Sequence, residues 1–202
     1  MRLLLKTSAA IVMTAALGAC SLGGMLGGGK APTNLVTLTP EAPEPSQIVR
    51  AAAAGQAITI STPSVARELS TVRVPVQVSA TDVQYVANLQ LVDTPAKLFG
   101  GLLSETVRRT TNRVVLDPTQ STLDPGLAVT GTLQRFGYDA ATRQVVVTYD
   151  GSLSAAGGNR VVTRRFSATS PADGTAATVG PALNRAANQV AASVAAWVAG
   201  GA

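Results

Sequence analysis

Apolar and polar residues alternate along this chain with two different periods. A period of two, which is typical of a half-buried strand, is clearest where Val72, Val74, Val76 and Val78 are separated by other residues. Similar runs occupy residues 58–60, 83–91, 114–116, 127–138, 145–153 and 160–168. Short loops join the last three runs, so we expect an antiparallel meander there. Because proline has no backbone N–H to donate, Pro75 is predicted to lie at a sheet edge or a bulge.

A period of three to four residues marks two amphipathic helices. The first follows the cap and proline signal Asp93-Thr94-Pro95, and its apolar face is Leu98, Phe99, Leu102, Leu103, Thr106 and Val107. The second runs from Pro181 to Trp197, with Asn184, Arg185, Asn188 and Gln189 opposite its apolar face. Together these patterns predict a single α+β domain, in which a mixed, mostly antiparallel sheet of five to seven strands packs with two main helices.

The first twenty residues have the features of an export signal. Arg2 and Lys6 supply positive charge, and the apolar stretch 8–17 follows. Ten helical residues rise only about 15 Å, roughly half of a bilayer's hydrocarbon core, so a permanent transmembrane span is disfavoured. We therefore predict that residues 1–19 are a signal peptide that is removed.

The end of this segment, Leu17-Gly18-Ala19-Cys20, resembles the lipobox of bacterial lipoproteins. That resemblance implies that Cys20 is the lipid attachment site, carrying a diacylglycerol on its thiol and an N-acyl chain such as palmitate. Two or more acyl chains give stable membrane anchoring. Ser21, in place of Asp, implies sorting to the periplasmic face of the outer membrane of a Gram-negative envelope, with the inner membrane as the alternative.

Residues 20–47 are rich in glycine and then in proline, which is typical of a flexible and then extended tether. Within this tether, residues 33–38 are equally compatible with a first short strand of the sheet. The spacing of Gly24 to Lys30 matches a phosphate-binding loop, but Ala31 stands where Ser or Thr is needed, so we reject that motif. We expect the folded domain to span residues 48–202.

Composition then limits the chemistry. The 202 residues include no histidine and one cysteine, which excludes a Ser-His-Asp or Cys-His relay and a histidine metal site. Asp93, Glu105, Asp117 and Asp150 each sit beside a turn, cap or hairpin signal, which favours structural roles over a hydrolase. Seven aromatic residues and a net charge of +5 without a basic run argue against nucleic acid. We expect no catalytic residue, no metal and no cofactor.

Binding residues are harder to identify from the pattern. Arg73 and Tyr85 lie on the proline-containing strand and the next one, where an exposed edge can receive a partner, although a solvated edge has the same signature. Arg164 and Arg165 are candidates for lipid phosphate, but adjacent residues of a strand point to opposite faces. We expect Trp197 to be a core anchor.

Several segments, in their order, resemble the ABC-type transport auxiliary lipoproteins, including the Pqi-type lipoprotein that is associated with MCE-domain lipid transporters. They are the lipobox ending at Cys20, Leu35-Val36-Thr37-Leu38, residues 72–78, Val83-Gln84-Tyr85-Val86, Val92-Asp93-Thr94-Pro95 leading into 98–109, the hairpin around Phe136 and the alanine-rich final helix. Lys97-Leu98-Phe99 departs from the tryptophan that many members carry near the start of the first helix.

This resemblance implies a non-enzymatic lipoprotein that docks with an MCE-domain substrate-binding protein, an ABC permease and an ATPase. Such a system moves phospholipids or related hydrophobic molecules across the envelope, and a homo-oligomer is possible. The alternative is a lipoprotein carrier that itself binds a small apolar ligand between its sheet and its helices.

Overall fold

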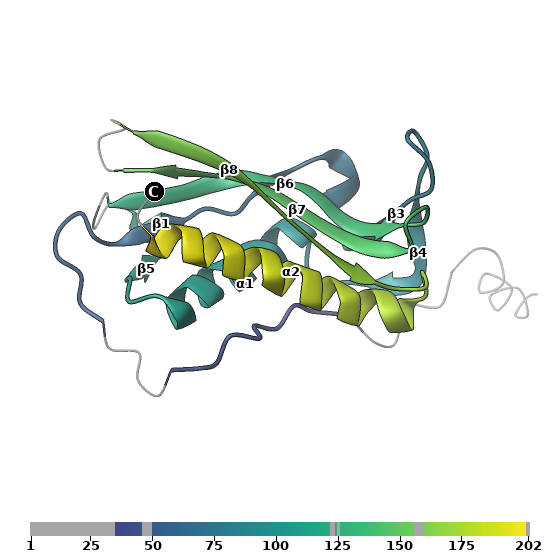
Figure 1. Ribbon diagram of the computed structural model, residues 1–202, viewed down its shortest axis with the longest axis horizontal. Helices are drawn as coiled ribbons and strands as arrows, with labels where there is room; N and C mark the ends of the chain where they lie inside the picture. The colour runs from purple at the N-terminus through teal and green to yellow at the C-terminus, as the bar shows by residue number, and fades with distance from the viewer. Residues whose placement is uncertain (1–34, 46–49, 122–123, 125, 156–159, 201–202) are drawn as a thin grey trace, which may run out of the picture. The chain divides into compact units, whose positions relative to one another are not determined.

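The computed structural model describes residues 35–45, 50–121, 124, 126–155 and 160–200, which belong to one compact unit. Its eight strands form one mixed sheet, and two main helices cover one face of that sheet (Figure 1). The predicted α+β class is therefore confirmed. Within the described part of the chain, neither helix has the length and apolar character needed to span a bilayer.

The long strand β6 (Leu127–Asp139) organises the sheet. Along one edge it pairs with β7 (Gln144–Ser154), which pairs in turn with β8 (Val161–Pro171), and this confirms the predicted antiparallel meander. Along its other edge it pairs in parallel with three short strands in succession, β1 (Ile58–Ile60), β2 (Ser64–Val65) and β3 (Arg73–Gln77). β5 (Val115–Leu116) lies beyond β1, and β4 (Val83–Gln90) lies beyond β3.

Eight strands exceed the predicted five to seven. One reason is that β2 is a two-residue pairing of Ser64 and Val65 with β6, too short to leave an alternating pattern. Pro75 lies at a bulge, as expected, because the β3–β4 register shifts between Arg73 and Pro75. It does not lie on an edge strand, since β3 is flanked by β4 and β6.

The helices α1 (Pro95–Thr110) and α2 (Ala176–Ala199) bury their apolar faces against the sheet. The largest fully buried side chain is Tyr149 of β7, whose ring lies 5.3 Å from that of Phe99 on α1. Two paired glycines make room for it: a Cβ on Gly131 would come within 2.5 Å of the Tyr149 hydroxyl, and one on Gly151 within 2.9 Å of the ring. The hydroxyl donates to the Thr130 carbonyl at 2.9 Å, and burial raises the pKa of Tyr149.

Residues 36–42 belong to the segment that we predicted to be a tether from its glycines and prolines. In the structure they are held against the helices, and we call this segment the strap. Val36 forms an isolated β-bridge with Leu91, which directly follows β4. The first short strand that residues 33–38 could have formed is thus reduced to this one bridge. Thr39 and Glu41 donate backbone N–H groups to the side-chain oxygens of Asn184 and Asn188, at 2.8 Å each. Asn188 also donates to the Thr39 carbonyl at 2.9 Å.

These contacts correct the prediction that Asn184 and Asn188 face solvent. Asn188 is only 6% exposed, because the strap covers it. On the other side, Arg109 of α1 donates to the Ala42 carbonyl at 3.0 Å. The strap therefore links both helices to the segment that leads toward Cys20.

We expect Asn188→Ala to destabilise the full-length protein by about 1 kcal/mol, because the Glu41 backbone N–H and the Thr39 carbonyl lose their partly buried hydrogen bonds to this side chain. Urea unfolding measures this loss. The matched control is Gln189→Ala, the exposed neighbour on α2, which we expect to change stability by less than about 0.5 kcal/mol. Equal effects of the two substitutions contradict a structural role for the strap.

The start of α2 is held by Asp173, three residues before the helix. Its carboxylate accepts the Thr175 backbone N–H at 2.9 Å and the Thr175 hydroxyl at 2.7 Å, and it also accepts the Thr178 hydroxyl. These hydrogen bonds, with that from Thr178 the largest, lower the pKa of Asp173 to about 2.

Since the folded pKa lies below the ordinary 3.8, ionised Asp173 stabilises the fold at neutral pH, and this stabilisation is lost as pH falls from about 4 to about 2. We expect Asp173→Asn to lower the Tm at pH 7, with the difference from wild type shrinking across that window. Thermal unfolding at a series of pH values tests this. Asp82→Asn removes the same charge from a distant turn and serves as the control; an identical pH profile for both variants contradicts the prediction.

Candidate partner-docking site

Arg73 and Tyr85, which the sequence pattern put forward together as partner-binding candidates, contact each other in the structure. The Arg73 guanidinium carbon lies 4.1 Å from the centre of the Tyr85 ring, a stacked cation–π contact. Arg73 is exposed and Tyr85 is half-buried. Both belong to the β3–β4 hairpin, on the sheet face opposite the helices, which we call the open face.

The same β3–β4 register shift decides which β4 side chains share this face. Arg73 pairs with Gln90 and Pro75 pairs with Tyr85, so β4 accommodates extra residues between these pairs. Asn88 takes a positive φ of 56° within the bulge, a conformation that Asn tolerates better than most residues.

The predicted alternation, which put Val83, Tyr85 and Ala87 on one face with Leu89, is therefore wrong. The bulge reverses the side-chain direction. Val86 and Leu89 are both buried, whereas Val83 is 39% exposed beside Tyr85. An aromatic ring, an arginine and an exposed valine thus lie on one hairpin.

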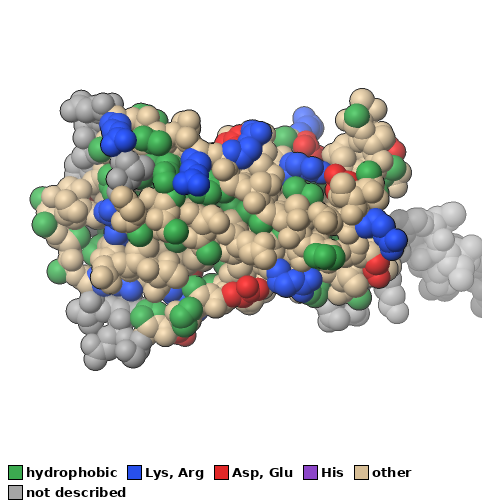
Figure 2. Space-filling model, in the orientation of Figure 1, with side chains coloured by type: hydrophobic (Ala, Val, Ile, Leu, Met, Phe, Trp, Pro, Cys, Tyr) green, Lys and Arg blue, Asp and Glu red, His purple; other side chains and the backbone are tan. Residues whose placement is uncertain are grey.

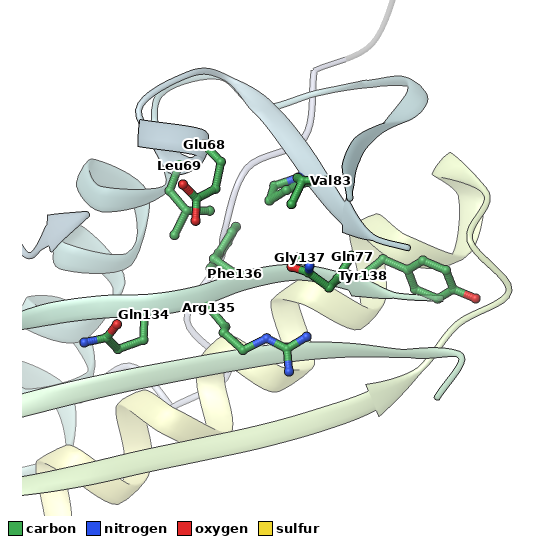
Figure 3. Close-up of a pocket in the computed structure, with 10 residues that line it drawn as sticks. Glu68, Leu69, Gln77, Val83, Gln134, Arg135, Phe136, Gly137 and Tyr138 are labelled. Carbon is green, nitrogen blue, oxygen red and sulfur yellow. The ribbon is translucent and has the colours of Figure 1, made fainter. Parts of the chain in front are cut away.

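A small cavity lies beside the hairpin on the open face (Figure 3). Its lining residues come from the η1 turn (Arg67–Leu69), the β3–β4 hairpin and the middle of β6. Its volume is 40 Å³, close to the volume of one water molecule, about 30 Å³. It therefore provides a dimple for one side-chain end, not a chamber for a lipid.

Elsewhere on the open face, charges are paired. Arg165 donates two hydrogen bonds to Asp150, at 2.6 and 2.7 Å, and Arg135 donates to Asp139 at 2.8 Å. These arginines are the first cause that lowers the pKa of each carboxylate. Lys and Arg side chains are likewise dispersed over the surface seen in Figure 2 and form no single-sign patch there.

Arg164 and Arg165 point to opposite faces, as expected for neighbours on a strand. Arg164 lies over Phe166, 5.4 Å from its ring centre, on the side of the helices. Trp197 is half-buried and packs on the same Phe166 at 5.4 Å. The two arginines therefore cannot form one phosphate site.

The four acids expected to be structural have structural contacts. Asp93 accepts the Thr94 backbone N–H at 2.7 Å, and Glu105 accepts from Arg109 at 2.7 Å. Asp150 pairs with Arg165, and Asp117 directly precedes the η2 turn (Pro118–Gln120).

The space between sheet and helices is packed with side chains. Five residues there are less than 2% exposed: Phe99, Leu103, Leu133, Tyr149 and Leu183. A carrier that holds an apolar ligand in this place would have to separate them. The lipobox residues Leu17, Gly18, Ala19 and Cys20 lie outside the described residues.

Comparison with known proteins identifies this architecture. A family model described as the ABC-type transport auxiliary lipoprotein component matches residues 37–195. Among solved structures, a protein of Xanthomonas campestris assigned to the DUF330 family is 19% identical, with a TM-score of 0.64; the match covers 84% of this chain and 94% of that one.

A second solved structure, of an uncharacterized protein, is 13% identical with a TM-score of 0.59, covering 82% of this chain and 99% of that one. At these identities the likeness shows the fold alone. No curated protein matches the sequence.

Proposed function

Since this chain belongs to the ABC-type transport auxiliary lipoprotein component family, we propose that it is the outer-membrane-anchored docking component of an MCE-type transport system. In this role Cys20 holds the protein to the periplasmic face of the outer membrane. The folded domain binds the MCE-domain protein, which works with an ABC permease and an ATPase to move phospholipids or related hydrophobic molecules. The protein itself carries out no chemical reaction.

This proposal rests on one contrast. Side chains fill the interior between the sheet and the helices, whereas the β3–β4 hairpin presents side chains at the surface that a partner protein can bind. The interior between the sheet and the helices is occupied by the five buried side chains named above. The hairpin, in contrast, offers a stacked arginine and tyrosine with an exposed valine. Arginine and tyrosine are enriched among the residues that dominate binding energy at protein interfaces. A surface for protein contact is therefore better supported than a ligand chamber.

The reach of the chain fits an anchored docking domain. Fourteen residues lie between Cys20 and Leu35, the first described residue. Fully extended they span at most about 50 Å, and as a flexible chain their root-mean-square length is about 22 Å. The domain would thus work close to the leaflet that holds the acyl chains.

The anchor is tested with Cys20→Ala in the native host. We expect the wild-type chain to begin at Cys20, to carry a diacylglycerol and an N-acyl chain by intact-mass analysis, and to fractionate with the outer membrane. We expect Cys20→Ala to lose both features and to abolish complementation of a transport-deficient strain, with Ser21→Ala as the matched control. An unmodified cysteine in the wild type, or full complementation by an exported Cys20→Ala protein, contradicts the proposal.

The docking surface is tested with Arg73→Ala and Tyr85→Ala. We expect each to weaken binding to the purified MCE-domain protein of the same host at least tenfold, about 1.4 kcal/mol, measured by biolayer interferometry. Because both side chains are on the surface, each substitution should lower stability by less than about 1 kcal/mol.

Gln84→Ala is the control, since Gln84 is exposed on the same strand but points to the other face. Unchanged affinity for both variants removes the hairpin as the docking surface. A wild-type protein that binds no MCE-domain protein contradicts the function itself.

A further inference from the structure

A second surface feature lies at the end of the sheet, where β8 ends and α2 begins. There a cavity of 530 Å³ opens to the surface and is lined by Arg143, Pro171, Ala172, Ala177, Thr178, Pro181 and Arg185. We propose that this cavity binds the phosphodiester of a phospholipid headgroup.

Two guanidinium groups from different elements carry the proposal. Arg143 belongs to the turn between β6 and β7, and Arg185 belongs to α2. Among the described residues neither forms an ion pair, whereas Arg135 and Arg165 of the same sheet are each paired with an aspartate. Arg185 donates its Nε–H to the Ser170 hydroxyl at 3.1 Å, which orients it and leaves its terminal nitrogens for a ligand. Guanidinium groups recognise phosphate oxygens through several N–H donors at once.

The charge of the neighbourhood fits a singly charged ligand. Asp173 lies beside the cavity and, with its pKa of about 2, is ionised at neutral pH. It is engaged by Thr175 and Thr178 and forms no ion pair with either arginine. Two cations and one nearby anion leave one net positive charge, which matches the single negative charge of a phosphodiester, whereas inorganic phosphate near neutral pH is a mixture of singly and doubly charged ions. The remaining walls, made by prolines and alanines, suit the glycerol part of a lipid.

The backbone of Arg143 supports a role for its side chain. Its φ is +54°, in the left-handed region, where glycine is favoured and a side chain carries a steric cost. No ion pair to a described residue offsets this cost. An arginine held in a conformation better suited to glycine is expected where its guanidinium has another partner.

The cavity also lies near the point where the chain enters the fold. Val36 packs against Gly180, and Thr39 is bonded to Asn184, on the same turns of α2 that contribute Pro181 and Arg185. The first described residues of the chain therefore lie near the cavity. Nearness to lipid headgroups, unlike the charge of the cavity, depends on the proposed anchor.

The test uses the full-length protein in nonionic detergent, with ¹⁵N-labelled arginine, observed by NMR. Glycerophosphoglycerol, a water-soluble diester headgroup, is added in one series and inorganic phosphate in another. We expect glycerophosphoglycerol to cause saturable shifts of the Arg143 and Arg185 Nε–Hε signals while Arg165 stays unchanged. Shifts with inorganic phosphate alone, equal shifts of all arginines, or no shifts overturn the proposal.

Arg143→Gly separates binding from folding, because glycine suits the positive φ while the guanidinium is lost. We expect its Tm to equal or exceed that of wild type and its affinity for glycerophosphoglycerol to fall at least tenfold. Arg185→Gln should weaken binding to a similar extent, and Arg165→Gln should leave it unchanged. Wild-type affinity in Arg143→Gly overturns the proposal. Binding of the MCE-domain protein, measured separately, tells this failure apart from failure of the docking function.

Discussion

The fold depends on how Tyr149 is accommodated between the sheet and the helices. Its ring needs the space that Gly131 and Gly151 leave on two neighbouring strands, and it fills that space against Phe99 of α1. The hydroxyl donates to the Thr130 carbonyl, so this buried polar group is paired. With this contact in place, the helices close one face of the sheet and the functional surfaces must lie on the open face and at the sheet ends.

The strap, at the N-terminal end of the described chain, is also held against the two helices. Two asparagines of α2 supply the acceptors for its backbone, and Arg109 of α1 holds its far end. The described segment nearest to Cys20 is thus fastened to both helices and not only to the end of β4. In the proposed function, this fastening gives the domain a defined end toward the leaflet, with the arginine cavity at that end and the docking hairpin on the open face.

Both surfaces arise from departures from regular geometry. The bulge between β3 and β4 turns Tyr85 outward beside Arg73, and the positive φ of Arg143 places its side chain at the cavity. Regular strands would have buried Tyr85 with Leu89. Such bulges depend on which residues face each other across strands, so a single strand's sequence carries little trace of them.

Periodicity alone determined both helices, the meander of β6 to β8 and the α+β class, because each depends on local spacing that one segment contains. Composition alone excluded histidine-based chemistry, because a missing residue type is missing from every arrangement. Only the tertiary structure decided the register of β4, the short strand β2, the burial of Asn188 and the presence of Arg143 and Arg185 at one cavity. Each of these requires segments far apart in sequence to be brought into contact, and only the packed core sets those distances.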